Sequence, residues 1–94
     1  MSKPFEAQAW RAQRGSTAHD NPRVFMVVPL ERDGHLREGM ARAEVLDLLG
    51  PPDRATARND QYRLGASPVG VDYETYVIDY NEVDQVLRFQ VRRG

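Results

Sequence analysis

Two different spacings of apolar residues divide the chain at its middle. In the first half, Val45, Leu48 and Leu49 stand at positions i, i+3 and i+4, and Ala41 lies one helical turn earlier. Gly50 suits the left-handed position that ends a helix, and Pro51 and Pro52 cannot continue one. The pattern therefore predicts an amphipathic helix over about Ala41 to Leu49.

After this helix the pattern changes to alternation, which is typical of strands. Tyr76, Ile78 and Tyr80 alternate with other residues in a segment rich in aromatic and β-branched side chains, which predicts a strand over Tyr73 to Tyr80. We expect three connecting or shorter segments: a polar link over Arg54 to Asp60, a short strand over Gln61 to Leu64, and a loop over Gly65 to Asp72.

The last predicted strand runs from Val86 to Arg92, after a hairpin loop over Asn81 to Gln85. Its alternation places Leu87, Phe89 and Val91 on one side, which we expect to face the core. We expect the opposite side to be part of a polar, solvated sheet face that carries Arg63, Val77, Asp79, Arg88, Gln90 and Arg92.

The N-terminal third has weaker patterns. A short helix is predicted over about Phe5 to Arg14, and its Trp10 is either a core side chain or an anchor for a partner. The polar segment Gly15 to Pro22 indicates a loop. The apolar segment Val24 to Leu30 has the composition of a strand but follows a helix-capping signal, so we expect a helix over about Pro22 to Arg32, interrupted near Pro29.

These elements predict a single α+β domain over residues 1–94. Its N-terminal helices pack on one face of a three-stranded antiparallel sheet, because neither the helices nor a lone hairpin can bury their apolar sides alone. Residues 1–35 would form a helical region and loop, and residues 36–94 the middle helix and the sheet.

A motif in the middle of the chain resembles the signature of a known family. The run Gly39-Met40-x-x-x-Glu44-Val45-x-x-x-Leu49-Gly50-x-Pro52 is similar to that of the SmpA/OmlA (BamE-like) family of small outer-membrane lipoproteins, and the resemblance covers about Leu36 to Val91. It implies the same order of helices and strands and a scaffold or accessory role in envelope assembly. Ala41 departs from the Thr or Ser that the family carries at this position.

A related fold occurs in a β-lactamase inhibitor protein. The resemblance therefore also allows a second role, in which an inhibitor or immunity-type protein binds one partner enzyme.

Composition limits the compartment and the partners. The 94 residues carry a net charge of −1, which gives no general attraction to nucleic acid or to an anionic membrane. The chain has no cysteine, no apolar signal segment and no run long enough to insert into a membrane. We expect a cytoplasmic protein as the sequence is written, or a periplasmic or outer-membrane one if a leader has been removed.

No reactive constellation is evident in the sequence. His19 with Asp20, and Asp33 with His35, could in principle bind a metal, but their spacing matches no metal motif, and we expect solvated turns. Neither a catalytic triad nor a phosphate-binding loop is present. We therefore expect a protein that is not an enzyme and needs no cofactor or metal. A cytoplasmic small-ligand binder is a further alternative.

The candidate binding residues are aromatic and basic side chains near the sheet. Tyrosine combines a large contact area with a low entropy cost, and an unprotected edge strand invites strand addition or swapping between copies. We expect a protein partner, and either a monomer or a strand-swapped dimer. The candidate protein-binding residues are Tyr62, Tyr73, Tyr76, Arg63, Arg88 and Arg92, together with the loop before Tyr73.

Overall fold

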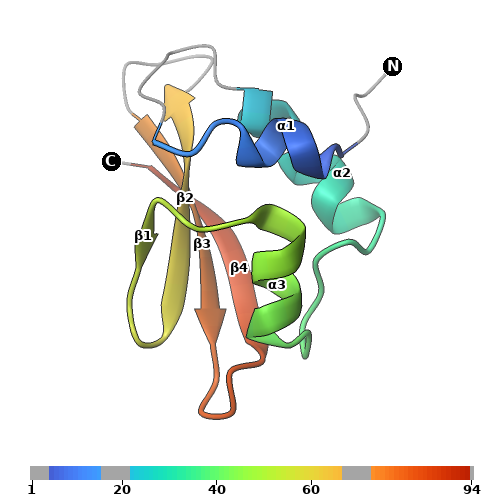
Figure 1. The fold of residues 1–94 in the computed structure, drawn as a ribbon, viewed down its shortest axis with the longest axis vertical. Coiled ribbons are helices and arrows are strands. Elements are labelled where there is room, and N and C mark those ends of the chain that lie inside the picture. The colour runs from blue at the N-terminus through green and yellow to red at the C-terminus, as the bar shows by residue number, and fades with distance from the viewer. Residues whose placement is uncertain (1–4, 16–21, 67–72, 94) are drawn as a thin grey trace.

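The computed structural model describes residues 5–15, 22–66 and 73–93. Within these ranges the chain forms one small α+β domain in which the helices precede a four-stranded antiparallel sheet, as Figure 1 shows. The helical elements are α1 (Ala7–Arg11), the 3-10 helix η1 (Pro22–Phe25), α2 (Val27–Arg32) and α3 (Arg42–Leu49). The strands are β1 (Arg54–Ala55), β2 (Asn59–Ala66), β3 (Tyr73–Tyr80) and β4 (Val86–Arg93).

The predicted α+β class is confirmed, but the predicted number of strands is wrong. The sheet has the order β1-β2-β3-β4, and the extra strand β1 lies in the segment that we expected to be a polar link. A tight turn explains it: the Thr56 amide donates to the Asn59 carbonyl, and the Thr56 hydroxyl accepts from the Arg58 and Asn59 amides. The turn brings Arg54 opposite Gln61 without any apolar alternation in the sequence.

Helix α3 begins one residue later than predicted, with Ala41 as its N-cap and no side-chain capping bond. The turn before it is fixed by backbone bonds to the start of β4: the Gly39 amide donates to the Val86 carbonyl, and the Val86 amide donates to the Met40 carbonyl, both at 2.8 Å. Gly39 has φ +84°, a conformation that glycine adopts readily. The motif turn therefore attaches α3 to the edge of the sheet.

The N-terminal helices are shorter than predicted. Helix α1 covers Ala7–Arg11 within the predicted Phe5 to Arg14. The predicted break near Pro29 is wrong, because the break lies at Met26, between η1 and α2. Pro29 lies in the first turn of α2, where a missing amide hydrogen removes no intrahelical bond.

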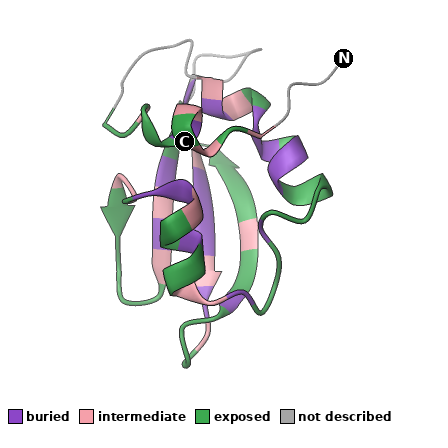
Figure 2. Ribbon diagram, turned by 45° about the vertical axis from the view of Figure 1, so that its right-hand side comes forward, coloured by how far each residue is buried: buried purple, intermediate pink, exposed green. Residues whose placement is uncertain are grey.

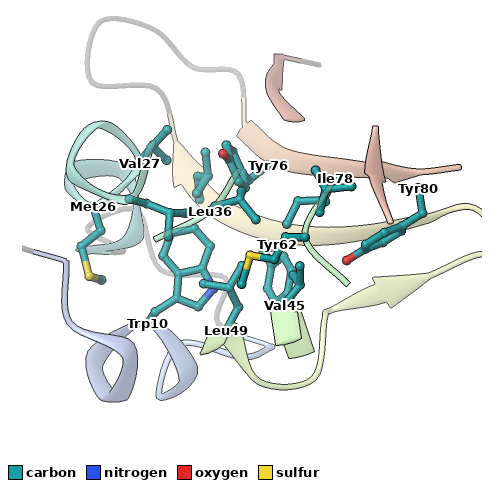
Figure 3. Packing of buried hydrophobic residues seen from close by; sticks show 14 residues of the cluster. Trp10, Met26, Val27, Leu36, Val45, Leu49, Tyr62, Tyr76, Ile78 and Tyr80 are labelled. Carbon is teal, nitrogen blue, oxygen red and sulfur yellow. The ribbon is translucent and has the colours of Figure 1, made fainter. Parts of the chain in front are cut away.

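The core lies between the helices and one face of the sheet (Figure 2). Trp10 is fully buried, with the rings of Tyr62 and Tyr76 at 5.7 and 6.0 Å in edge-on contact. Figure 3 shows these side chains within the core. Trp10 is therefore a core side chain, which resolves the alternative left open by the sequence. Around it pack Met26, Leu30, Leu36, Val45, Leu49, Leu64 and Ile78.

The strand β4 is much less covered than its sequence predicts. Phe89 is half-buried and lies 6.5 Å from the ring of Tyr76, but Leu87 and Val91 are 48% and 41% exposed. The expectation that all three face the core is thus correct only for Phe89. The reason is position in the sheet: β4 is an edge strand, so its far side has no neighbouring strand within the described chain.

Candidate functional site

The structure separates the predicted binding residues into core and surface groups. Tyr62 and Tyr76 are both 0% exposed, so neither belongs to a binding surface, and this part of the prediction is corrected. The Tyr62 hydroxyl donates to the Gly50 carbonyl at 2.7 Å, and the Tyr76 hydroxyl donates to Glu31 Oε1 at 2.8 Å. Burial raises the pKa of both phenols well above the usual range, so these tyrosines are neutral structural groups.

The remaining candidates are at the surface. Tyr73 is 51% exposed at the start of β3. Arg63, Arg88 and Arg92 are exposed on the side of the sheet that the helices leave uncovered, called here the open sheet face. Residues 67–72, which belong to the loop that we included in the predicted surface, lie outside the described ranges.

The register shows which side chains share the open sheet face. Opposite residues of an antiparallel pair project to the same side. Three rows of neighbours cross the sheet: Asn59, Asp79 and Arg88; Arg54, Gln61, Val77 and Gln90; and Arg63, Thr75 and Arg92.

Basic residues dominate these rows. In the described chain the open sheet face carries four arginines and one carboxylate, Asp79. Arg88 Nε donates to Asp79 at 3.0 Å, and Arg92 Nη2 donates to the Gln61 side chain at 3.1 Å. Val77, expected to be solvated, is only 4% exposed because this central position is flanked on both sides. The face is basic although the whole chain is slightly acidic.

An apolar groove of about 590 Å³ opens on the helix side of the sheet, next to β4. We call it the α2–β4 groove. Its apolar lining comes from η1, α2, β2 and β4, and its two charged lining residues come from β3 and β4. The lining residues are Val24, Val27, Val28, Leu64 and Val91, with Glu74 and Arg93.

The rim of the α2–β4 groove combines exposed apolar and charged side chains. Val28 is 61% exposed and Val91 is 41% exposed. Arg93 Nε donates to Glu74 Oε2 at 2.9 Å; the Glu74 side chain is almost fully buried, whereas that of Arg93 is largely exposed. An apolar floor beside a charged rim is the usual composition of a protein contact surface.

The buried charges have structural roles. Arg23 is fully buried and donates to Asp53 at 2.8 Å and to the backbone carbonyls of Trp10 and Arg63. Burial lowers the pKa of Arg23, and Asp53 opposes that effect. These bonds join η1 to α1 and β2, so this pair holds elements together and points away from solvent.

A second buried carboxylate connects α3 to the sheet. Asp60 is 1% exposed and accepts from the Tyr80 hydroxyl at 2.7 Å and from Arg42 Nη2 at 2.8 Å. Burial, and then the hydrogen bond to Asp60, raises the pKa of Tyr80. Arg42 also donates to the carbonyls of Thr56 and Ala57, which fixes the β1–β2 turn. This network also serves the fold.

The sequence did not reveal the groove residues on η1 and α2. The segment over Val24 to Leu30 is apolar at nearly every position, so no periodicity separates its buried side from its exposed side. The usable signal is the excess of apolar residues in this segment. A six-residue helix cannot bury every residue of such a run, and Val28 remains exposed. The sequence pattern does not place Arg54 on the open sheet face, because it does not predict the strand β1.

Of the predicted metal ligands, His19 and Asp20 lie outside the described residues, and Asp33 and His35 are both exposed. Across ranges 5–15, 22–66 and 73–93, no group of three or more potential ligands gathers in one place. No helix in those ranges has the length and apolar character needed to cross a bilayer.

No protein-family profile, characterised protein or solved structure matches this chain. The resemblance to the SmpA/OmlA family therefore stays a prediction from the motif.

Proposed function

We propose that this protein is a non-catalytic protein-binding domain whose contact surface is the α2–β4 groove and the adjoining edge of β4. One observation carries the proposal: Val28 and Val91, both lining the apolar groove, are 61% and 41% exposed, and Leu87, further along the same strand β4, is 48% exposed. Exposed apolar residues that gather beside a concave surface are typical of interaction sites.

The exposed apolar area sets the scale of the binding free energy. Each exposed aliphatic side chain that a partner covers contributes roughly 1–2 kcal/mol, at about 25 cal/mol per Å² of apolar surface. The groove floor adds further apolar surface, and the ion pair between Arg93 and Glu74 provides an orienting polar contact at its rim. A contact of this composition supports specific but moderate binding.

The sequence motif indicates the cellular process in which the binding takes place. Resemblance to the SmpA/OmlA family supports an accessory or scaffold role in envelope assembly. The structure gives the motif residues folding roles: Gly39 makes the turn onto β4, and the Gly50 carbonyl accepts the Tyr62 hydroxyl. A motif that specifies the fold is compatible with several partners.

Affinity capture from the native host tests the proposal with a matched pair of variants. Val28→Glu places a charge at the groove, and Val83→Glu makes the same change at a valine in the β3–β4 hairpin that is 70% exposed, against 61% for Val28. Both variants should fold, since both side chains are more than half exposed. A defined partner should be captured by the wild type and by Val83→Glu and be lost with Val28→Glu.

Equal capture by all three proteins would refute the groove as the contact surface. Soluble and envelope fractions should be captured separately. A partner from the envelope fraction would support the family role, and one soluble enzyme would support the inhibitor role instead.

The groove also favours one alternative, a small-ligand site with an apolar floor and the Glu74–Arg93 pair at its rim. A panel of apolar carboxylates and amines tests it by thermal shift. A ligand that raises the melting temperature of the wild type but not of Val28→Glu would favour this alternative.

A further inference from the structure

We propose that the outer edge of β4 binds an extended, acidic segment of a partner protein as a fifth strand, with apolar and acidic residues alternating along that segment. The inference rests on the proposed function, because it states how the partner is held. Three features of β4 carry it: its unpaired edge, its apolar side and its basic side.

The edge of β4 already accepts a short pairing segment at its beginning. Gly39 and Met40 form two backbone hydrogen bonds with Val86, and both run outward from the sheet. Beyond Val86, Leu87 lies at a register shift, residues Arg88 to Arg93 pair with β3 on one side, and none of these residues pairs with another described strand. This stretch offers about 23 Å of strand, at about 3.3 Å per residue, and its outward amide and carbonyl groups are the donors and acceptors that an added strand uses.

The helix side of this edge selects apolar residues. Leu87, Phe89 and Val91 share that side by strand alternation, and Val91 lines the α2–β4 groove together with Val28. Every second side chain of an added strand would lie beside this row, where Leu87 and Val91 are exposed. Aliphatic side chains at those positions would cover both and enter the groove.

The open side selects acidic residues. Arg88 and Arg92 are exposed there on either side of Gln90, and Arg63 lies in the same row as Arg92. Carboxylates on the intervening positions of the added strand would lie next to these guanidinium groups, whereas basic side chains would be repelled.

The same charges argue against a second copy of this chain. An antiparallel pair of β4 strands centred on Gln90 would place Arg88 of one copy directly opposite Arg92 of the other. Like charges directly opposite each other destabilise a strand pair. The occupant that fits is therefore a different, acidic chain.

Three labelled heptapeptides test the inference on the purified full chain. The first alternates valine and glutamate, the second alternates valine and lysine, and the third has the composition of the first with its residues in two blocks. The alternating acidic peptide should bind at least about tenfold more tightly than either of the others, because like charges at an interface are strongly disfavoured. Backbone amide resonances and hydrogen exchange over residues 87–93 should report the new hydrogen bonds.

Arg92→Glu provides the charge-reversal variant, because its neighbours Thr75 and Gln61 are uncharged. It should weaken the acidic peptide and strengthen the lysine peptide, while Val83→Glu should change neither. Circular dichroism and thermal melting verify that both variants are folded. A preference that fails to shift in folded Arg92→Glu overturns the inference.

Other outcomes separate the inference from the proposed function. Perturbation of Val28 and Val91 without slower exchange on β4 would overturn strand addition but leave the groove as a protein contact. Equal binding of all three peptides, or tighter binding of a single-stranded oligonucleotide of the same charge, would overturn the acidic-strand inference. A concentration-dependent dimer that excludes the acidic peptide would also overturn it.

Discussion

The buried ion pair between Arg23 and Asp53 should contribute strongly to the stability of the fold. The Arg23 side chain is fully buried, and the Asp53 side chain is only 5% exposed to solvent. Asp53 also accepts hydrogen bonds from the Gly15 and Arg63 amides. Removing one partner of such a pair leaves a charge buried without compensation, which costs about 3–5 kcal/mol.

Asp53→Ala should therefore lower the free energy of unfolding by about 3–5 kcal/mol, out of a total of about 5–15 kcal/mol for a domain of this kind. Urea denaturation followed by Trp10 fluorescence measures the change. Arg88→Met is the control, because the Arg88–Asp79 pair lies at the surface and its loss should cost less than about 1 kcal/mol. A loss below about 1 kcal/mol in Asp53→Ala as well would refute the buried pair.

Acid titration gives the same pair a second test. Burial alone would raise the pKa of Asp53, but hydrogen bonds from the Arg63 and Gly15 amides and from Arg23 outweigh it and hold the pKa below its ordinary value of 3.8. A lowered folded-state pKa contributes stability that is complete above the unfolded-state pKa and is lost as pH falls through the folded-state pKa. The stability difference between the wild type and Asp53→Asn should therefore be full at neutral pH and shrink below pH 3.8. A difference that grows as the pH falls would contradict the assignment.

Three further predictions concern the fold. Gly50→Ala should destabilise the protein by about 2–3 kcal/mol in thermal melts, because Gly50 has φ 75° and ψ −175° and an added Cβ would lie 2.5 Å from a side-chain atom of α1. Gly34→Ala is the control: Gly34 has φ +72° but open space around it, so this variant should cost about 1 kcal/mol in the same melts. Tyr80→Phe should cost about 1–3 kcal/mol in urea, since Asp60 loses a buried donor. Burial raises the folded-state pKa of Tyr62, Tyr76 and Tyr80 above 10, the ordinary pKa of tyrosine. A raised folded-state pKa contributes stability that is lost at high pH, so the stability of the protein should fall as pH rises above 10. Absorbance at alkaline pH should show that these tyrosines ionise normally only after unfolding.

The parts of the fold that were predicted well are those with local signals. Helix α3 has its apolar spacing and its glycine stop within a few residues, and β3 has a long aromatic alternation. Both were placed to within one residue. The strand β1 has only two residues and depends on the Thr56 turn, so no pattern in its own sequence indicates it.

The site was harder to predict because burial depends on neighbours in space. Tyr62, Tyr73 and Tyr76 look alike in sequence, yet Tyr62 and Tyr76 lie opposite each other under Trp10, while Tyr73 lies at the exposed start of β3. The polar alternation of β4 was correct, but its apolar side is only partly covered, because the sheet places β4 at an edge. Three of the four arginines of the open sheet face, Arg63, Arg88 and Arg92, were predicted because charge and strand parity are local properties.

Site-specific photo-crosslinking in the native host tests the central claim, that the α2–β4 groove is a protein contact surface, most directly. A photoreactive amino acid is placed in turn at Val28 and Val91 in the groove and at Val83 in the hairpin, each of which is at least 41% exposed. We expect a discrete adduct with one partner protein from positions 28 and 91 and none from position 83. Adducts from position 83 alone, or from none of the three positions, would contradict it.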